Sequence, residues 1–177
     1  MRRSNQLLAT LLVASAACAL APAYAGGKPD LSAFIGRWQI DPSRTTMGRD
    51  GPSANNILRS NTFTFQFTQQ GKEVEMEVYA QYPAPEPTRT QPVIADGKVR
   101  VCMSKNPCLT VGGDQKDQTF AWFGMDAHML ARLFWMKGRI YDYSSLTVSS
   151  DGKTLTLISW APATPYWQNI QVFTRQD

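Results

Sequence analysis

Thr62-Phe63-Thr64-Phe65-Gln66-Phe67-Thr68 and, after Gln70-Gly71, Val74-Glu75-Met76-Glu77-Val78-Tyr79-Ala80 are the stretches that decide the fold. In the first run phenylalanines alternate with polar residues, and in the second aliphatic residues alternate with glutamates. This two-residue period is the side-chain period of a β-strand. Two such runs joined by a short turn containing glycine predict an antiparallel hairpin with one buried and one solvated face.

The same period recurs along most of the chain. We expect further strands over Gly36–Asp41, Lys98–Met103, Gln118–Phe123, His128–Met136, Arg139–Val148, Lys153–Trp160 and Trp167–Arg175. The prolines between Pro83 and Pro92 exclude a central strand there. Without helical crossovers, strands joined in sequence favour an all-β fold. We therefore predict an antiparallel up-and-down β-barrel of about eight strands. A sandwich is the alternative.

The N-terminus has the pattern of a secretory signal peptide. Arg2-Arg3 is followed by an apolar run from Leu7 to Leu20 and by the small-residue cleavage pattern Ala23-Tyr24-Ala25. We predict a signal peptide over residues 1–25, one domain over residues 26–177, and a periplasmic or secreted location. No membrane insertion is expected after cleavage. Cys18 leaves a lipoprotein as the alternative, although Ser15 stands where a lipobox has an aliphatic residue.

The net charge and the cysteines of the chain indicate which partners it lacks and whether it carries a disulfide. Without Arg2 and Arg3 the formal charge falls from +4 to about +2, and no Lys/Arg run is present, so we expect no nucleic-acid partner. Cys102 and Cys108 are then the remaining cysteines, and an even pair in an oxidising compartment predicts a disulfide. Their spacing is not that of a Cys-x-x-Cys redox pair.

Two segments carry a family resemblance. Phe34–Asp41, with Gly36-Arg37-Trp38, resembles the Gly-x-Trp opening of lipocalin-type barrels. Val148–Thr156 with Asn169–Arg175 is similar to the end of small exported bacterial proteins with a lipocalin-like (calycin-type) barrel. Shorter matches are Asp41-Pro42-Ser43-Arg44 and Asp50-Gly51-Pro52.

This resemblance implies structural roles for three residues. Gly36 and Trp38 would begin the first strand, with the Trp38 ring plugging the closed end of the barrel. Arg175 would stack over Trp38, a cation–π contact; the alternative is a solvated charge at a strand end. The chain lacks the Thr-Asp-Tyr motif and the flanking helix of lipocalins, so the resemblance concerns the fold more than the function.

The sequence contains none of the common catalytic motifs. His128 stands two residues after Asp126 but has no ordered partners for a triad, and no Gly-x-Ser-x-Gly turn or phosphate-binding glycine loop is present. We therefore expect no catalytic residue, no metal site and no cofactor. Glu73, Glu75 and Glu77 share the solvated face of the hairpin.

The alternating pattern of the predicted strands indicates candidate residues for a ligand pocket. Phe63, Phe65, Met76 and Trp122 are inward-facing in the pattern, either as plain core or as the lining of a cavity. Asp142 falls on the face of Ile140, Leu146 and Val148, together with Ser144. An inward carboxylate needs a polar partner; it marks either a polar point in a cavity or a break in the pattern near the barrel mouth.

Three hypotheses follow. The first is a non-catalytic periplasmic protein that binds a small apolar or amphipathic ligand inside the barrel. The second is an envelope protein–protein interaction module with a packed core. The aromatic cluster of Trp160, Tyr166 and Trp167 either caps one end of the core or forms a rim for a flat apolar ligand or a partner surface. The third is an enzyme resembling barrel-fold isomerases or cyclases, which requires a buried Asp142 or Asp126 beside Tyr or Arg.

Overall fold

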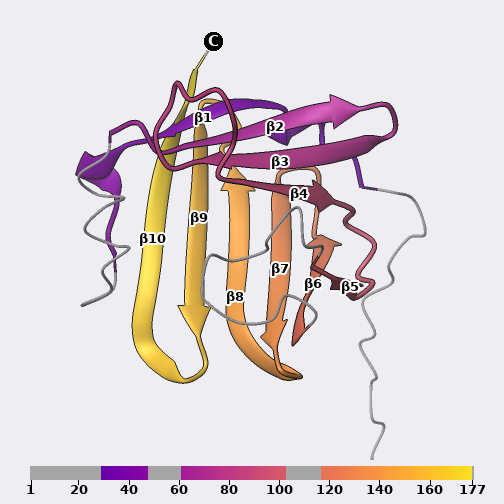
Figure 1. Ribbon diagram of the computed structural model, residues 1–177. Coiled ribbons are helices and arrows are strands. Elements are labelled where there is room, and N and C mark those ends of the chain that lie inside the picture. The colour runs from indigo at the N-terminus through magenta and orange to yellow at the C-terminus, as the bar shows by residue number, and fades with distance from the viewer. Residues whose placement is uncertain (1–28, 48–60, 103–116, 177) are drawn as a thin grey trace, which may run out of the picture.

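The computed structural model describes residues 29–47, 61–102 and 117–176, which form one antiparallel sheet of ten strands (Figure 1). The strands are β1 (Gly36–Ile40), β2 (Thr64–Gln70), β3 (Glu73–Tyr79), β4 (Arg89–Val93), β5 (Arg100–Val101), β6 (Gln118–Gly124), β7 (Met129–Met136), β8 (Arg139–Val148), β9 (Thr154–Ala161) and β10 (Thr164–Gln176). Two 3-10 helices, η1 (Ser32–Phe34) and η2 (Pro42–Arg44), flank β1. The predicted all-β antiparallel fold is confirmed.

Strand β1 joins the two halves of the curled sheet. The strand order is β4-β3-β2-β1-β10-β9-β8-β7-β6-β5, so β1 pairs with both β2 and the last strand, β10. In Figure 1, β1 to β3 run across the ends of β7 to β10, which gives the sheet the form of a curled half-barrel. The inner face of this curl collects the buried side chains.

Strands β4 and β5 end the sheet order and are not paired with each other. The chain between them contacts β6 instead, through an isolated bridge between Asp96 and Phe123. Next to it, the Gly97 N–H donates to the Trp122 carbonyl at 2.8 Å. A bidentate ion pair from Arg100 to Asp96, with both contacts at 2.9 Å, holds this turn in shape.

The described residues form ten strands, not the predicted eight or so, and β4 is the strand that the pattern missed. It lies inside the proline-rich stretch, with Pro92 opposite Glu75 of β3. Proline has no N–H to donate to a ladder, so it is confined to edge strands. β4 is such an edge, which agrees with the exclusion of a central strand at this point.

The hairpin of β2 and β3 follows the predicted alternation. Phe63, Phe65 and Phe67 are buried, and Phe65 and Phe67 stand opposite Val78 and Met76. The glutamates of β3 lie on the other face. Burial of aromatic and aliphatic side chains on a single face therefore forms this part of the inner wall.

Strand β8 departs from strict alternation at its beginning. The β7–β8 register shifts between Phe134, which is opposite Asp142, and Trp135, which is opposite Ile140. A bulge of this kind adds one residue to one strand. The side chains before the bulge then point to the opposite face of the sheet from the one that strict alternation predicts. The expectation that Ile140 shares the inner face with Asp142 is therefore wrong: Ile140 is 37% exposed.

The end of the barrel at β1 is closed by Trp38, as the resemblance implies. The Trp38 side chain is fully buried, and its Nε1 donates to the Phe34 carbonyl of η1 at 2.8 Å. The Arg175 guanidinium lies over the indole ring, 4.1 Å from its centroid, so the predicted stacking contact is present. Gly36 has φ 133°, and a Cβ there would come within 2.8 Å of Arg175 Nη1. A side chain at position 36 would displace the arginine.

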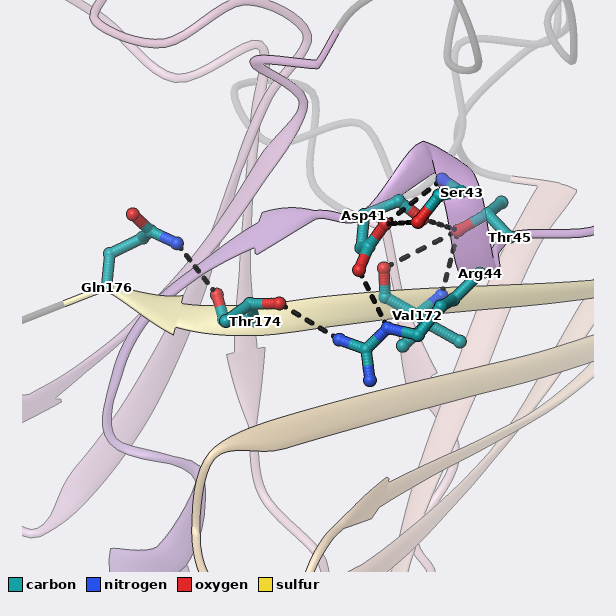
Figure 2. Close-up of polar contacts among 7 residues, drawn as sticks. All are labelled: Asp41, Ser43, Arg44, Thr45, Val172, Thr174 and Gln176. Atoms are coloured by element: carbon teal, nitrogen blue, oxygen red, sulfur yellow. Dashed lines mark hydrogen bonds and ion pairs between the residues drawn. The ribbon is translucent and has the colours of Figure 1, made fainter.

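A polar turn after β1 ties η2 to β10 (Figure 2). Asp41 accepts from the Ser43 hydroxyl at 2.6 Å and pairs with Arg44 at 2.7 Å, and these two contacts lower the pKa of its carboxyl to about 2. Arg44 also donates to Thr174 at 3.1 Å. The Thr45 hydroxyl accepts from the Val172 N–H at 3.0 Å. The Asp-Pro-Ser-Arg motif is therefore a structural turn.

Several predicted features lie outside the described residues. They are the signal peptide over residues 1–25 with Cys18, the Asp50-Gly51-Pro52 loop, and Cys108. Cys102 is buried, and its pairing with Cys108 stays a prediction. Across the described residues, none of the helices has the length and apolar character needed to cross a membrane.

Candidate ligand-binding interior

The inner face is apolar toward the end closed by Trp38. The Phe65 ring lies 4.6 Å from the Phe173 ring and 5.4 Å from the Phe63 ring, measured between centroids. Phe63, Phe65 and Met76, three of the predicted pocket residues, are each 6% exposed and belong to one buried cluster. These side chains form the apolar wall of the interior.

Farther from Trp38, one cross-strand row of the inner face is mostly polar. The row crosses β6 to β10 in register and consists of Trp122, Arg132, Ser144, Ser159 and Asn169. Side chains of register partners lie on the same face of a sheet. Polar groups from four consecutive strands, β7 to β10, therefore lie at one level of the interior.

Arg132 is fixed in this row by Asp142 and Ser144. Its Nη2 donates to Asp142 Oδ1 at 3.0 Å and to Ser144 Oγ at 3.3 Å, and the serine hydroxyl donates to the same carboxylate oxygen at 2.6 Å. The Arg132 and Asp142 side chains are 14% and 19% exposed. Asp142, predicted to face inward with a polar partner, does so, and its partner is an arginine.

Two hydrogen-bond donors of the polar row are buried without a partner in the described part of the chain. They are Trp122 Nε1 and Arg132 Nε. Trp122 is 1% exposed, and the Arg132 guanidinium lies 5.5 Å from its ring centroid. The Oε1 atoms of Gln118 and Gln171 are buried in the same way. Each such group costs about 1–3 kcal/mol unless something bonds to it, so these atoms mark places where a bound molecule would be stabilised.

A second arginine reaches the interior from β4. Arg89 lies at the end of the inward-facing register Trp38–Phe65–Val78 across β1 to β4. Burial and the nearby positive charge of Arg132 lower the pKa of Arg89 to about 10. The two cations therefore lie close enough to repel.

The other sequence candidates are not at this site. His128 and Asp126 are exposed in the turn before β7, where the His128 N–H donates to Asp126 Oδ1 at 2.7 Å. The described residues contain no group of three or more His, Cys, Asp or Glu side chains that could hold a metal ion.

Sequence reasoning missed Arg132 and Arg89. Both are inward residues of alternating strands: Arg132 lies between Leu130 and Phe134, and Arg89 precedes Gln91 and Val93. A charged residue at an inward position of a predicted strand indicates a polar site in the interior. This pattern was present for Arg132 but was interpreted only for Asp142. For Arg89 the signal was absent, because its strand was not predicted.

The outer face carries a separate aromatic pair. Tyr143 and Trp160 are register partners on β8 and β9, and their rings stack with centroids 5.5 Å apart and planes 12° apart. Trp160 is 39% exposed. The side chains of Tyr166 and Trp167, the other members of the predicted aromatic cluster, fall outside the described part of the structure.

No protein-family model matches the chain, and no curated protein matches its sequence. Solved structures do match its fold. The zebrafish ileal bile acid-binding protein, solved with cholic acid, has a TM-score of 0.53 at 18% identity, covering 82% of this chain and all of that one. Lipid binding protein 8 of Caenorhabditis elegans, in its apo form, gives 0.53 at 9% identity over 85% of this chain and 100% of the other.

A third structure, the fluorescent protein UnaG, has a TM-score of 0.50 at 10% identity and covers 81% of this chain and 97% of its own. At such identities the likeness concerns the fold alone. The chain therefore has the calycin-like fold of these proteins, with ten antiparallel strands curled around an inner face that is apolar at one end and polar in one row.

Proposed function

We propose that this protein is a non-catalytic binding protein that holds a small amphipathic molecule on the inner face of its barrel, in the periplasm or outside the cell. The observation that carries the proposal is the pair of buried, unbonded donors on Trp122 and Arg132 next to an apolar wall. An interior that was simply packed would be expected to satisfy its polar groups. Concave apolar sites with a few convergent polar groups are typical of small-molecule binding.

The fold likeness supports the ligand class. Two of the similar structures are, by name, a lipid-binding and a bile acid-binding protein. Apolar or amphipathic small molecules are therefore the ligands we propose for this interior. The leader pattern of residues 1–25 supports export.

Native mass spectrometry of protein purified from the envelope of its own host tests this proposal. We expect a population heavier than the apoprotein by the mass of one small molecule, which organic extraction removes. The fold is monitored by circular dichroism before and after extraction. Repeated absence of any adduct, across growth conditions, would count against a ligand carrier.

A second candidate is favoured by the outer face. The stacked Tyr143–Trp160 pair, with Trp160 39% exposed, offers aromatic contact area to a protein partner in the envelope. In that case the unbonded interior donors would be satisfied by buried water. The enzyme hypothesis gains only the proximity of Asp142 to Arg132, and we do not propose it.

A further inference from the structure

Trp122 and Arg132 form a pair of donors from adjacent strands. They are direct register partners on β6 and β7, and both side chains lie on the inner face. Each has a buried nitrogen, the indole Nε1 and the guanidinium Nε, that donates to no atom of the described residues. Since both atoms are donors only, the group that satisfies them must accept hydrogen bonds.

Asp142 and Ser144 define which edge of Arg132 remains available. They accept from Nη2, and Nε is a buried donor that they leave unbonded. The Ser144 hydroxyl, held by Asp142 at 2.6 Å, adds a second restraint on the same side. Asp142 is thus a positioning residue that fixes the guanidinium through Nη2.

The positive charge at this site favours an anionic hydrogen-bond acceptor over a neutral one. The unbonded Nε belongs to the Arg132 guanidinium, which carries a positive charge. An anionic oxygen between donors of this kind makes charge-assisted hydrogen bonds, which are about twice as strong as neutral ones.

We propose that Trp122 Nε1 and Arg132 Nε together bind the anionic oxygen of an amphipathic acid, such as a carboxylate. This inference rests on the proposed function and names the ligand class. The neighbouring row toward the closed end contains Leu130, Leu146 and Leu157, and Gln171 continues it on β10. The apolar part of the acid lies along that row, toward Trp38, and the acid group lies at the polar row.

Isothermal titration calorimetry with decanoate and decan-1-ol on the full protein tests the inference. The two compounds share a chain length and differ in the charge of the head group. We expect decanoate to bind about ten- to a hundred-fold more tightly than the alcohol, since a hydrogen bond to a charged group contributes about 1.5–3 kcal/mol. Equal affinities would overturn the anion site while leaving the proposed interior binding intact.

Two variants locate the site. Trp122→Phe keeps an aromatic ring but removes the pyrrole half of the indole together with its N–H. We expect decanoate affinity to fall about ten-fold and decan-1-ol affinity to fall less, because the alcohol reports the lost packing without the charged acceptor. Arg132→Gln removes the cation and lowers decanoate affinity further; its fold is checked by circular dichroism because Asp142 loses its partner. Arg139→Gln is the matched control: Arg139 is exposed at the start of β8, and the same change in net charge there leaves decanoate affinity unchanged.

The outcomes separate the two proposals. If Trp122→Phe and Arg139→Gln both bind decanoate as the unchanged protein does, the donors are not the anion site. If the unchanged protein binds neither compound and carries no adduct in native mass spectrometry, both the anion site and the proposed function are wrong.

Discussion

Replacing Trp38 by alanine lowers the free energy of unfolding by about 3–5 kcal/mol, the usual cost of truncating a fully buried large aromatic side chain. The Trp38 ring is 0% exposed and plugs the end of the barrel where β1 joins the two halves of the sheet. The change also removes the bond from Nε1 to the Phe34 carbonyl and the ring beneath Arg175. Urea unfolding followed by circular dichroism measures the loss.

Trp160→Ala is the matched control for this experiment. It makes the same chemical change on the outer face, where Trp160 is 39% exposed and loses mainly its stacking on Tyr143. We expect a cost of about 1 kcal/mol there. Similar losses in the two variants would contradict the assignment of Trp38 as the closing residue.

Arg175→Met has the second largest expected effect, a loss of about 2–4 kcal/mol in the free energy of unfolding. Three of its nitrogens donate to backbone carbonyls: Nε to Gly152 at 2.6 Å, Nη1 to Ile35 at 2.6 Å and Nη2 to Ala33 at 2.7 Å. One side chain therefore joins the β8–β9 turn to the segment around η1. Methionine fills part of the volume but leaves all three carbonyls without this donor.

The Arg175→Lys variant shows whether stability depends on the planar shape of the guanidinium or only on its positive charge. A lysine ammonium is a compact point charge and cannot reach three separated carbonyls as the planar guanidinium does. We expect Arg175→Lys to recover less than half of the stability lost in Arg175→Met. Full recovery by lysine would show that the charge alone matters. Arg44→Met, which breaks the exposed ion pair to Asp41, should cost less than about 1 kcal/mol and serves as the control.

The fold was predictable from the sequence where a local rule applies. Alternation over Phe63–Phe67 and Val74–Val78 predicts the hairpin, since one apolar face must be buried. The Gly-x-Trp segment and Arg175, far apart in the sequence, were paired by resemblance, and the structure places them in contact. Strand β4 was not predictable, because its proline content hides an edge strand that needs only one hydrogen-bonded neighbour.

The polar part of the interior was only half predictable. Asp142 was visible as a carboxylate on an apolar face, but its partner Arg132 depends on the β7–β8 register. A bulge sets that register, and alternation within one strand carries no information about a bulge in its neighbour. The approach of Arg89 to Arg132 depends on the curl that brings β4 to the same interior.

The central claim is that the inner face of the barrel binds an amphipathic molecule at the Trp122–Arg132 level. The most direct test is the indole N–H resonance of Trp122 in a ¹⁵N–¹H NMR titration with decanoate. We predict that this resonance shifts strongly and saturably, because its proton gains a charged acceptor, while the exposed Trp160 resonance stays in place. A Trp122 resonance that does not move at saturating decanoate, or a response confined to Trp160, would contradict the account.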